Sequence, residues 1–300
     1  MAQINKKLGI KISSLTAALA LASCAAIGGP PAGAQTVSTP GALPAAIPSE
    51  MASYADLVAL SDNSELVIRA EIRRQIKVDP ERAQGVKPGY ARLYIEARTL
   101  GLIAGNRGVG ESLAYVVDVA LDAKGKVPKL KKSEVLIFAN RVTGRPGVVQ
   151  LTGDAAQFAY SPELEARLRP ILTGLVSNNA PPVVTGIADA LAVKGTLVGE
   201  SETQVFLKTV SGSPVSFTVV RRPNEVPRWG VSWGEIIDSS ATAPAPRTLE
   251  WYRLACALPG RLPSSANLAR DPETRNLAEQ DYRLVIESLG PCERRVTGKT

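Results

Sequence analysis

The residues from Leu66 to Val78 alternate between apolar and polar side chains, which is the pattern of a β-strand with one buried face. The apolar row consists of Leu66, Ile68, Ala70, Ile72, Ile76 and Val78, and Arg74 interrupts it. A long strand with one such defect predicts a bend or a β-bulge, because a bulge turns a strand without ending it. One bent strand can then pair on two sides of a barrel.

Four shorter strands follow, separated by turn residues. Alternation predicts strands at 90–98 and 113–121, and short apolar runs predict two more at 135–139 and 148–151. The glycine-rich segment 101–112 has neither a Walker pattern nor a following helix, so it is interpreted as a strand connection. Five strands predict a small OB-like β-barrel, although the spacing does not separate this from another five- or six-stranded barrel.

The second half of the chain combines strands and helices. Ser161-Pro162-Glu163 is typical of a helix start, and Pro170 inside the helix that follows should kink or split it. Strands are predicted at 205–210, 215–220 and 229–237, forming a meander. Thr248 and Asp271 are predicted to cap two helices that form a C-terminal hairpin. The expected fold class is therefore mainly β with an α+β organisation.

The first residues predict export. Three lysines precede an apolar run from Leu15 to Ile27, which is long enough for a signal peptide and too short to span a bilayer. Two processing sites compete: a lipobox, Leu21-Ala22-Ser23-Cys24, in which Cys24 would be lipidated, and Ala32-Gly33-Ala34 with cleavage before Gln35. Removing residues 1–23 leaves 32 basic and 28 acidic residues, so the formal net charge falls from +7 to +4.

The domain boundaries follow from composition. Residues 1–23, or alternatively 1–34, form the signal peptide, and the Pro- and Ala-rich segment 24–50 is a tether. The predicted units are a β-barrel-like domain with its helix at 51–180, a β-meander at 181–245 and a helical hairpin at 246–300. Apart from Cys24, the cysteines are Cys256 and Cys292, which are expected to form a disulfide in an oxidising compartment.

The composition excludes several chemistries. The chain has no histidine, so Ser-His-Asp and Cys-His catalysis and histidine-ligated zinc are impossible. Three cysteines are too few for a four-thiolate metal site within one chain. Glu200, Glu202, Glu235 and Asp238 are the carboxylates around the meander, and they are interpreted as solvated. We therefore predict no catalytic residue, no metal and no cofactor.

Two groups of residues are candidate binding surfaces. The first combines arginines and tryptophans of the meander: Arg221, Arg222, Arg228, Trp229 and Trp233. The alternative interpretation of this group is that the tryptophans belong to the core and the arginines are solvated surface residues. The second is the polar face of the first two strands, where Arg69 and Arg73 lie beside Arg92 and Arg98. Lys124, Lys126, Lys129, Lys131 and Lys132 are interpreted as a solvated loop that could meet anionic lipid headgroups.

The combination of a signal segment, a barrel-like domain, an Arg-Trp meander and a terminal disulfide resembles uncharacterised bacterial exported, lipoprotein-type envelope proteins. That resemblance implies a periplasmic location but no activity. The leading hypothesis is a non-enzymatic envelope protein that binds a protein or an envelope polymer and contacts the membrane only through a lipid anchor. The alternatives are a carboxylate-dependent glycan hydrolase and an anionic-polymer-binding barrel. Export disfavours nucleic acid as a partner.

Overall fold

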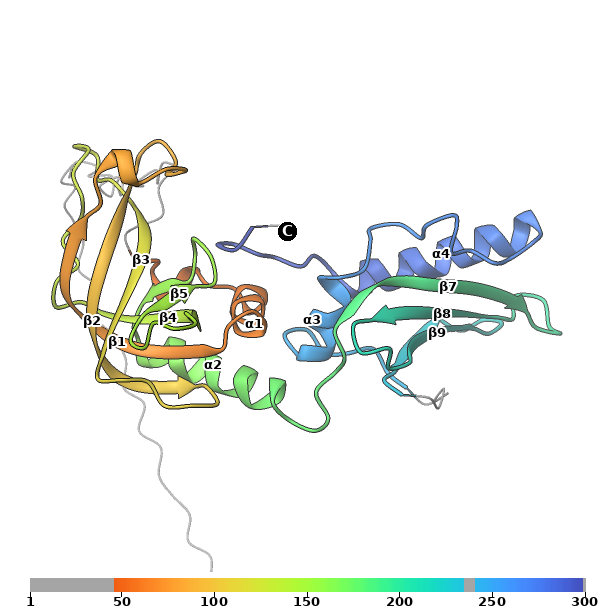
Figure 1. Cartoon of the computed structure of the whole chain (residues 1–300). Helices are drawn as coiled ribbons and strands as arrows, with labels where there is room; N and C mark the ends of the chain where they lie inside the picture. The colour runs from red at the N-terminus through yellow and green to blue at the C-terminus, as the bar shows by residue number, and fades with distance from the viewer. Residues whose placement is uncertain (1–45, 235–240, 299–300) are drawn as a thin grey trace, which may run out of the picture. The chain divides into compact units, whose positions relative to one another are not determined.

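The computed structural model describes residues 46–234 and 241–298, and its fold is mainly β (Figure 1). The signal segment, both processing sites and most of the tether lie outside the described residues. The first sheet contains β1 (Leu66–Lys77), β2 (Tyr90–Ala104), β3 (Ser112–Ala120), β4 (Glu134–Arg141), β5 (Val149–Leu151) and β6 (Gln157–Ala159). The second contains β7 (Val184–Lys194), β8 (Ser201–Thr209), β9 (Val215–Arg221) and β10 (Arg228–Ser232). The helices are α1 (Tyr54–Asp62), α2 (Pro162–Leu175), α3 (Leu249–Ala255) and α4 (Pro272–Leu289), with short 3-10 turns η1 (Ser49–Met51) and η2 (Pro80–Arg82).

The first sheet curls into a half-barrel around β1. The strand order is β3-β2-β1-β4-β5, with β6 also paired to β4, so β1 pairs on both of its edges (Figure 1). The register of β1 against β2 shifts between Ile72 and Arg74, which confirms the predicted irregularity at Arg74. An isolated parallel bridge between Ala114 and Val148 brings β3 and β5 together.

The apolar row of β1, as far as the bulge, lies at the centre of the half-barrel core. Leu66, Ile68, Ala70 and Ile72 are buried against β2, β3 and β4. Ile76 was expected to continue this row, but its side chain is 38% exposed. The register shift explains the difference, because a one-residue slip exchanges the two faces of a strand.

The second sheet has the order β10-β9-β8-β7, and α4 packs on β7 and β8. The strands β8, β9 and β10 correspond to the predicted meander, with β10 ending at Ser232. The strand β7 was not predicted. Its pairing with β8 shifts register between Val184 and Gly186 and again between Ile187 and Asp189. Because each shift interrupts the two-residue repeat, apolar and polar side chains do not alternate regularly along this strand.

The helix caps follow the sequence closely. The side chains of Ser161, Thr248 and Asp271 each accept a backbone N–H from the first turn of their helix, as predicted. Pro170 was expected to kink or split its helix; the split is wrong, since α2 is one helix through that residue. Pro170 and Ala166 are exposed, so water can satisfy the Ala166 carbonyl that loses its donor. The helix α1 was not predicted.

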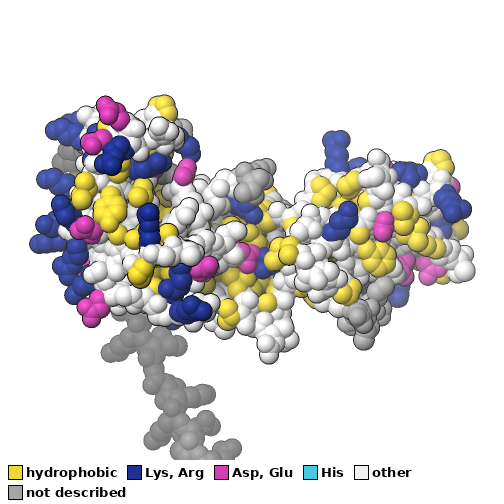
Figure 2. All heavy atoms as spheres, viewed as in Figure 1, with side chains coloured by type: hydrophobic (Ala, Val, Ile, Leu, Met, Phe, Trp, Pro, Cys, Tyr) yellow, Lys and Arg dark blue, Asp and Glu magenta, His cyan; other side chains and the backbone are white. Residues whose placement is uncertain are grey.

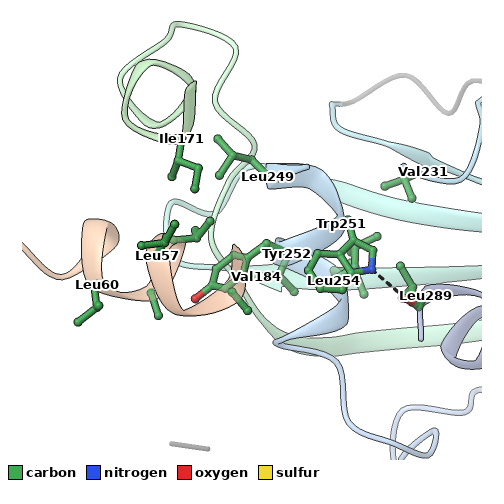
Figure 3. Close-up of a cluster of buried hydrophobic side chains, with 14 of the residues drawn as sticks. Leu57, Leu60, Ile171, Val184, Val231, Leu249, Trp251, Tyr252, Leu254 and Leu289 are labelled. Atoms are coloured by element: carbon green, nitrogen blue, oxygen red, sulfur yellow. Dashed lines mark hydrogen bonds between the residues drawn. The ribbon is translucent and has the colours of Figure 1, made fainter. Parts of the chain in front are cut away.

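A helical junction joins the two sheets into a continuous hydrophobic core. Figure 3 shows Leu57 of α1, Ile171 of α2 and Trp251 and Tyr252 of α3 gathered between these helices, in a buried cluster to which Leu60 also belongs. The Trp251 indole Nε1 donates a hydrogen bond to the Leu289 carbonyl at 2.8 Å. The buried Arg253 guanidinium forms an ion pair with Asp62 and donates to the Pro181 carbonyl at 3.2 Å. These bonds fix α3 against α1 and against the segment that enters β7.

Candidate functional site

The predicted disulfide is confirmed. Cys256 ends α3, Cys292 follows α4, and their Cα atoms are 5.1 Å apart. The bond closes a loop with a sequence separation of 36 residues, which stabilises a fold by about 3–4 kcal/mol in the chain-entropy account. Cys24, the predicted lipidation site, lies outside the described residues.

Two members of the Arg-Trp group hold α4 against the second sheet. The Arg221 guanidinium lies 2.6 Å from a carboxylate oxygen of Asp281, a fully buried residue of α4. The Trp229 indole donates a hydrogen bond to the Ser288 hydroxyl at 3.0 Å, and its ring meets Phe217 edge-on. Trp233 is half-buried and packs against the same core. These contacts match the interpretation of the tryptophans as core residues.

The remaining arginines of this group are exposed and separate. Arg228 pairs with Glu225 at 3.6 Å, and Arg222 lines a shallow hollow with Glu200 and Glu202. Glu200 itself accepts the Leu197 backbone N–H at 3.2 Å, so it closes the turn between β7 and β8. Two of the four candidate acids, Glu235 and Asp238, lie outside the described residues. Within the described ranges, the cation–π contacts use tyrosines and none uses a tryptophan.

The arginines of the half-barrel face are all engaged with carboxylates. Arg69 pairs with Glu134 at 2.6 Å and lies 3.8 Å over the Tyr160 ring. The three others form exposed or part-buried pairs: Arg73 with Glu71 at 3.3 Å, Arg98 with Glu71 at 3.0 Å and Arg92 with Asp118 at 2.7 Å. Such pairs contribute little stability, but they cancel local charge. The predicted basic groove therefore carries little uncompensated charge.

A cavity beside the helical junction is the site that the sequence did not reveal. Its volume is about 650 Å³, and its walls come from η1, the start of α1, α2, the start of α3 and the segment after Cys292. Tyr54 and Trp251 lie edge to face in this wall, with ring centroids 6.4 Å apart. A second hollow of about 410 Å³ shares Tyr54, Arg167 and Arg247. Hollows of this size accommodate small molecules or peptide side chains.

The charged side chains of the cavity lining are three arginines and two glutamates, Glu50 and Glu293, so the arginines are in excess by one. Arg167 donates to the Ala52 carbonyl, and Arg295 pairs with Glu293 at 3.4 Å. Arg247 is exposed and has neither a hydrogen bond nor an ion pair with any residue that the structure describes. A free guanidinium beside aromatic rings can grip a carboxylate or phosphate on two donors.

Tyr54 contributes a hydroxyl to the same wall. Burial, followed by the charge of Glu250, raises the pKa of Tyr54 to about 12, and Arg253 opposes this shift. The phenol therefore stays protonated at neutral pH and can donate a hydrogen bond to an anionic ligand. Tyr54, Arg167 and the segment that carries both Arg247 and Trp251 are far apart in the sequence, so no sequence spacing marks the four residues as a group.

No protein-family model matches the chain, and a search of curated proteins finds none with a similar sequence. Within 46–234 and 241–298, no helix is both long and apolar enough to cross a bilayer. Across the same ranges, acidic and cysteine side chains form no group of three or more that could hold a metal ion.

Proposed function

We propose that the chain is an exported, non-enzymatic binding protein whose ligand occupies the junction cavity. The observation that carries this proposal is the Arg247 guanidinium, which pairs with no residue that the structure describes and lines the same cavity of about 650 Å³ as the Tyr54–Trp251 pair. Arginine and aromatic residues dominate the energetics of protein recognition sites, because they supply large contact areas and directional donors together. A ligand with an exposed carboxylate, such as an acidic peptide segment, fits this chemistry.

The disulfide supports export, because such bonds persist in oxidising compartments. A periplasmic location and lipidation at Cys24 rest on the predicted leader and lipobox. The half-barrel also supports an OB-like identity, which we include in the proposal. Around its curl the neighbours are β1, β2, β3, β5 and β4, and β4 returns to β1. This is the neighbour order of a five-stranded OB barrel.

Photo-crosslinking in intact cells tests the junction cavity. A benzophenone amino acid in place of Pro246, an exposed residue of the cavity lining, leaves Arg247 intact and should yield one discrete adduct, in which mass spectrometry should identify an acidic segment as the captured site. The same substitution at Arg261, an exposed loop residue, is the control and should yield no such adduct. Arg247→Glu should abolish the adduct, because it reverses the charge that is proposed to bind the ligand. Identical adduct patterns at both positions would contradict the proposal.

Mass spectrometry of the native protein tests export. We expect a chain that begins at an acylated Cys24, or at Gln35, with Cys256 and Cys292 oxidised. If lipidation occurs, Cys24→Ala should move the protein from the membrane fraction to the soluble fraction or block processing. A chain that retains its initiator methionine and has all three thiols free would overturn export.

A further inference from the structure

The lysine-rich connection between β3 and β4 is anchored to β1. The backbone N–H of Lys132 donates to the Ile72 carbonyl at 2.7 Å, and the Ile72 N–H donates to the Ser133 carbonyl at 3.0 Å. The Gln75 amide donates to the Pro128 carbonyl at 2.9 Å, and its oxygen accepts the Leu130 N–H. These bonds extend the β1–β4 pairing beyond Glu134, so the segment is a fixed edge of the half-barrel.

This edge presents its lysines to solvent. Leu130 is buried in the half-barrel core, while Lys129, Lys131 and Lys132 are exposed. Lys124 and Lys126 are exposed in the preceding turn, where the Asp122 carboxylate accepts both of their backbone N–H groups at 2.8 Å. The five lysines together form what we term the lysine edge.

The lysine edge carries a local excess of positive charge, with five lysines beside the one carboxylate of Asp122. Its sequence contains no acid between Asp122 and Glu134, and both flanking carboxylates are occupied, Asp122 by the turn and Glu134 by Arg69. None of its side chains forms an ion pair with a residue that the structure describes. Figure 2 shows many Lys and Arg side chains on the half-barrel half of the molecule, where they outnumber the carboxylates among them.

Two neighbouring features distinguish the lysine edge from an ordinary solvated surface. Ile76 of β1 exposes 38% of its surface next to the anchored segment, and Lys77 beside it is also exposed. Lys132 has a φ of 72°, a left-handed conformation that costs a residue with a Cβ about 1 kcal/mol. Glycine would therefore be less strained than lysine at position 132.

We propose that the lysine edge docks on the anionic phospholipid headgroups of a bilayer, with Ile76 entering the interfacial layer. Lysine ammonium groups suit this role, because each contributes a compact charge that is attracted to a negatively charged surface without fixed geometry. Base stacking on single-stranded nucleic acid needs aromatic platforms, and residues 122–134 contain no aromatic side chain. The inference is independent of the junction cavity, whose residues lie on other elements.

Vesicle sedimentation tests the lysine edge. The chain from Gln35 onward keeps every described helix and strand and has no residue that can be lipidated at its start. We expect it to bind vesicles of phosphatidylcholine with phosphatidylglycerol, to bind phosphatidylcholine alone far less, and to be released by salt. The triple variant Lys129→Gln, Lys131→Gln, Lys132→Gln should weaken the partition coefficient by about 100-fold.

Matched variants separate a docking surface from a net-charge effect. Lys208→Gln, Arg222→Gln and Arg261→Gln together remove the same charge from exposed positions elsewhere, and this variant should keep its vesicle binding. Lys132→Gly should weaken binding while leaving thermal stability equal or higher, because glycine relieves the left-handed strain. Equal losses in the two triple variants would overturn the proposal. So would tighter binding to soluble polyphosphate than to the vesicles at equal phosphate concentration.

Discussion

Replacing Arg221 with leucine is expected to lower the free energy of unfolding by about 3–5 kcal/mol. Asp281 is a fully buried residue of α4, and its carboxylate accepts hydrogen bonds from the Arg221 guanidinium at 2.6 Å and from the Thr203 hydroxyl. Removing the guanidinium leaves a buried charge with one neutral donor. The cost arises mainly from that uncompensated charge, because a buried ion pair contributes little when both partners are exchanged for apolar residues.

The test is denaturant unfolding of three variants. Arg222→Leu is the control, since Arg222 is adjacent but exposed, and its effect should stay within about 0.5 kcal/mol. The double variant Arg221→Leu, Asp281→Leu should recover most of the lost stability, because it removes the orphaned carboxylate. If Arg221→Leu cost no more than Arg222→Leu, the pair would not be what holds α4 to the sheet.

The Arg221–Asp281 ion pair could not be predicted from the sequence. The sequence predicted neighbouring strands at 215–220 and 229–237, and the structure confirms that neighbourhood through the pairing of β9, which extends to Arg221, with β10. Asp281, the partner of Arg221, and Ser288, the partner of Trp229, lie on a helix that follows a long connection. Side-chain alternation reports which face of a strand is apolar, but it does not report which helix covers that face. An arginine buried against a carboxylate therefore has the same sequence pattern as a surface arginine.

Local patterns were reliable wherever the backbone was regular. Alternation predicted β1, β3 and the first part of β2, a short apolar run predicted β4, and capping residues predicted α2, α3 and α4, because these signals depend only on near neighbours. The last residues of β2, up to Ala104, were interpreted as part of a strand connection. The irregular strand β7 was missed, since its register shifts interrupt the alternation. The lysine edge was interpreted as a solvated loop because Gln75, the residue that anchors it, belongs to a strand more than fifty positions earlier.

The junction cavity needed information that no local pattern holds. Its arginines and aromatic rings come from segments around Tyr54, Arg167 and Trp251, which only the packing of α1, α2 and α3 brings together. The start of α1 did have a local signal. Ser53 and Asp56 form a capping box, with aspartate where glutamate or glutamine is usual. The Asp56 carboxylate also accepts hydrogen bonds from the C-terminal segment.

The Asp56 carboxylate ties the C-terminal segment to α1. It is fully buried and accepts from the Ser53 backbone at 2.9 Å and the Ser53 hydroxyl at 2.7 Å. It also accepts the backbone N–H groups of Arg295 at 3.0 Å, Val296 at 3.3 Å and Thr297 at 2.9 Å, and the Thr297 hydroxyl at 2.7 Å. One charged group thus satisfies two segments 240 positions apart in the chain.

These contacts determine a pH dependence. Burial alone would raise the pKa of Asp56, but the hydrogen bonds from Thr297 and Ser53 outweigh it and hold the pKa below its ordinary value of 3.8. The unfolded chain therefore takes up a proton at higher pH than the folded chain does. The stability that Asp56 contributes is complete above the unfolded-state pKa, and it is lost as the pH falls through the lower folded-state pKa.

Asp56→Asn is expected to lower the free energy of unfolding by about 3 kcal/mol at pH 7, because an amide replaces a charged acceptor of several hydrogen bonds. The difference from the wild-type protein should begin to narrow as the pH falls through 3.8, where Asp56 of the unfolded chain takes up a proton, and should keep narrowing down to the lower folded-state pKa. Urea unfolding across this range measures both effects. Glu50→Gln, an exposed acid near α1, is the control and should show no such convergence.

A shortened chain separates the hydrogen bonds between Asp56 and the C-terminal segment from the capping of α1 by the same carboxylate. A protein that stops at Arg294 loses the donors of residues 295–297 but keeps the capping box of Ser53. In that background Asp56→Asn should cost about half as much or less, since only the Ser53 bonds remain to be lost. An equal cost in the full and shortened chains would show that the C-terminal segment does not depend on Asp56.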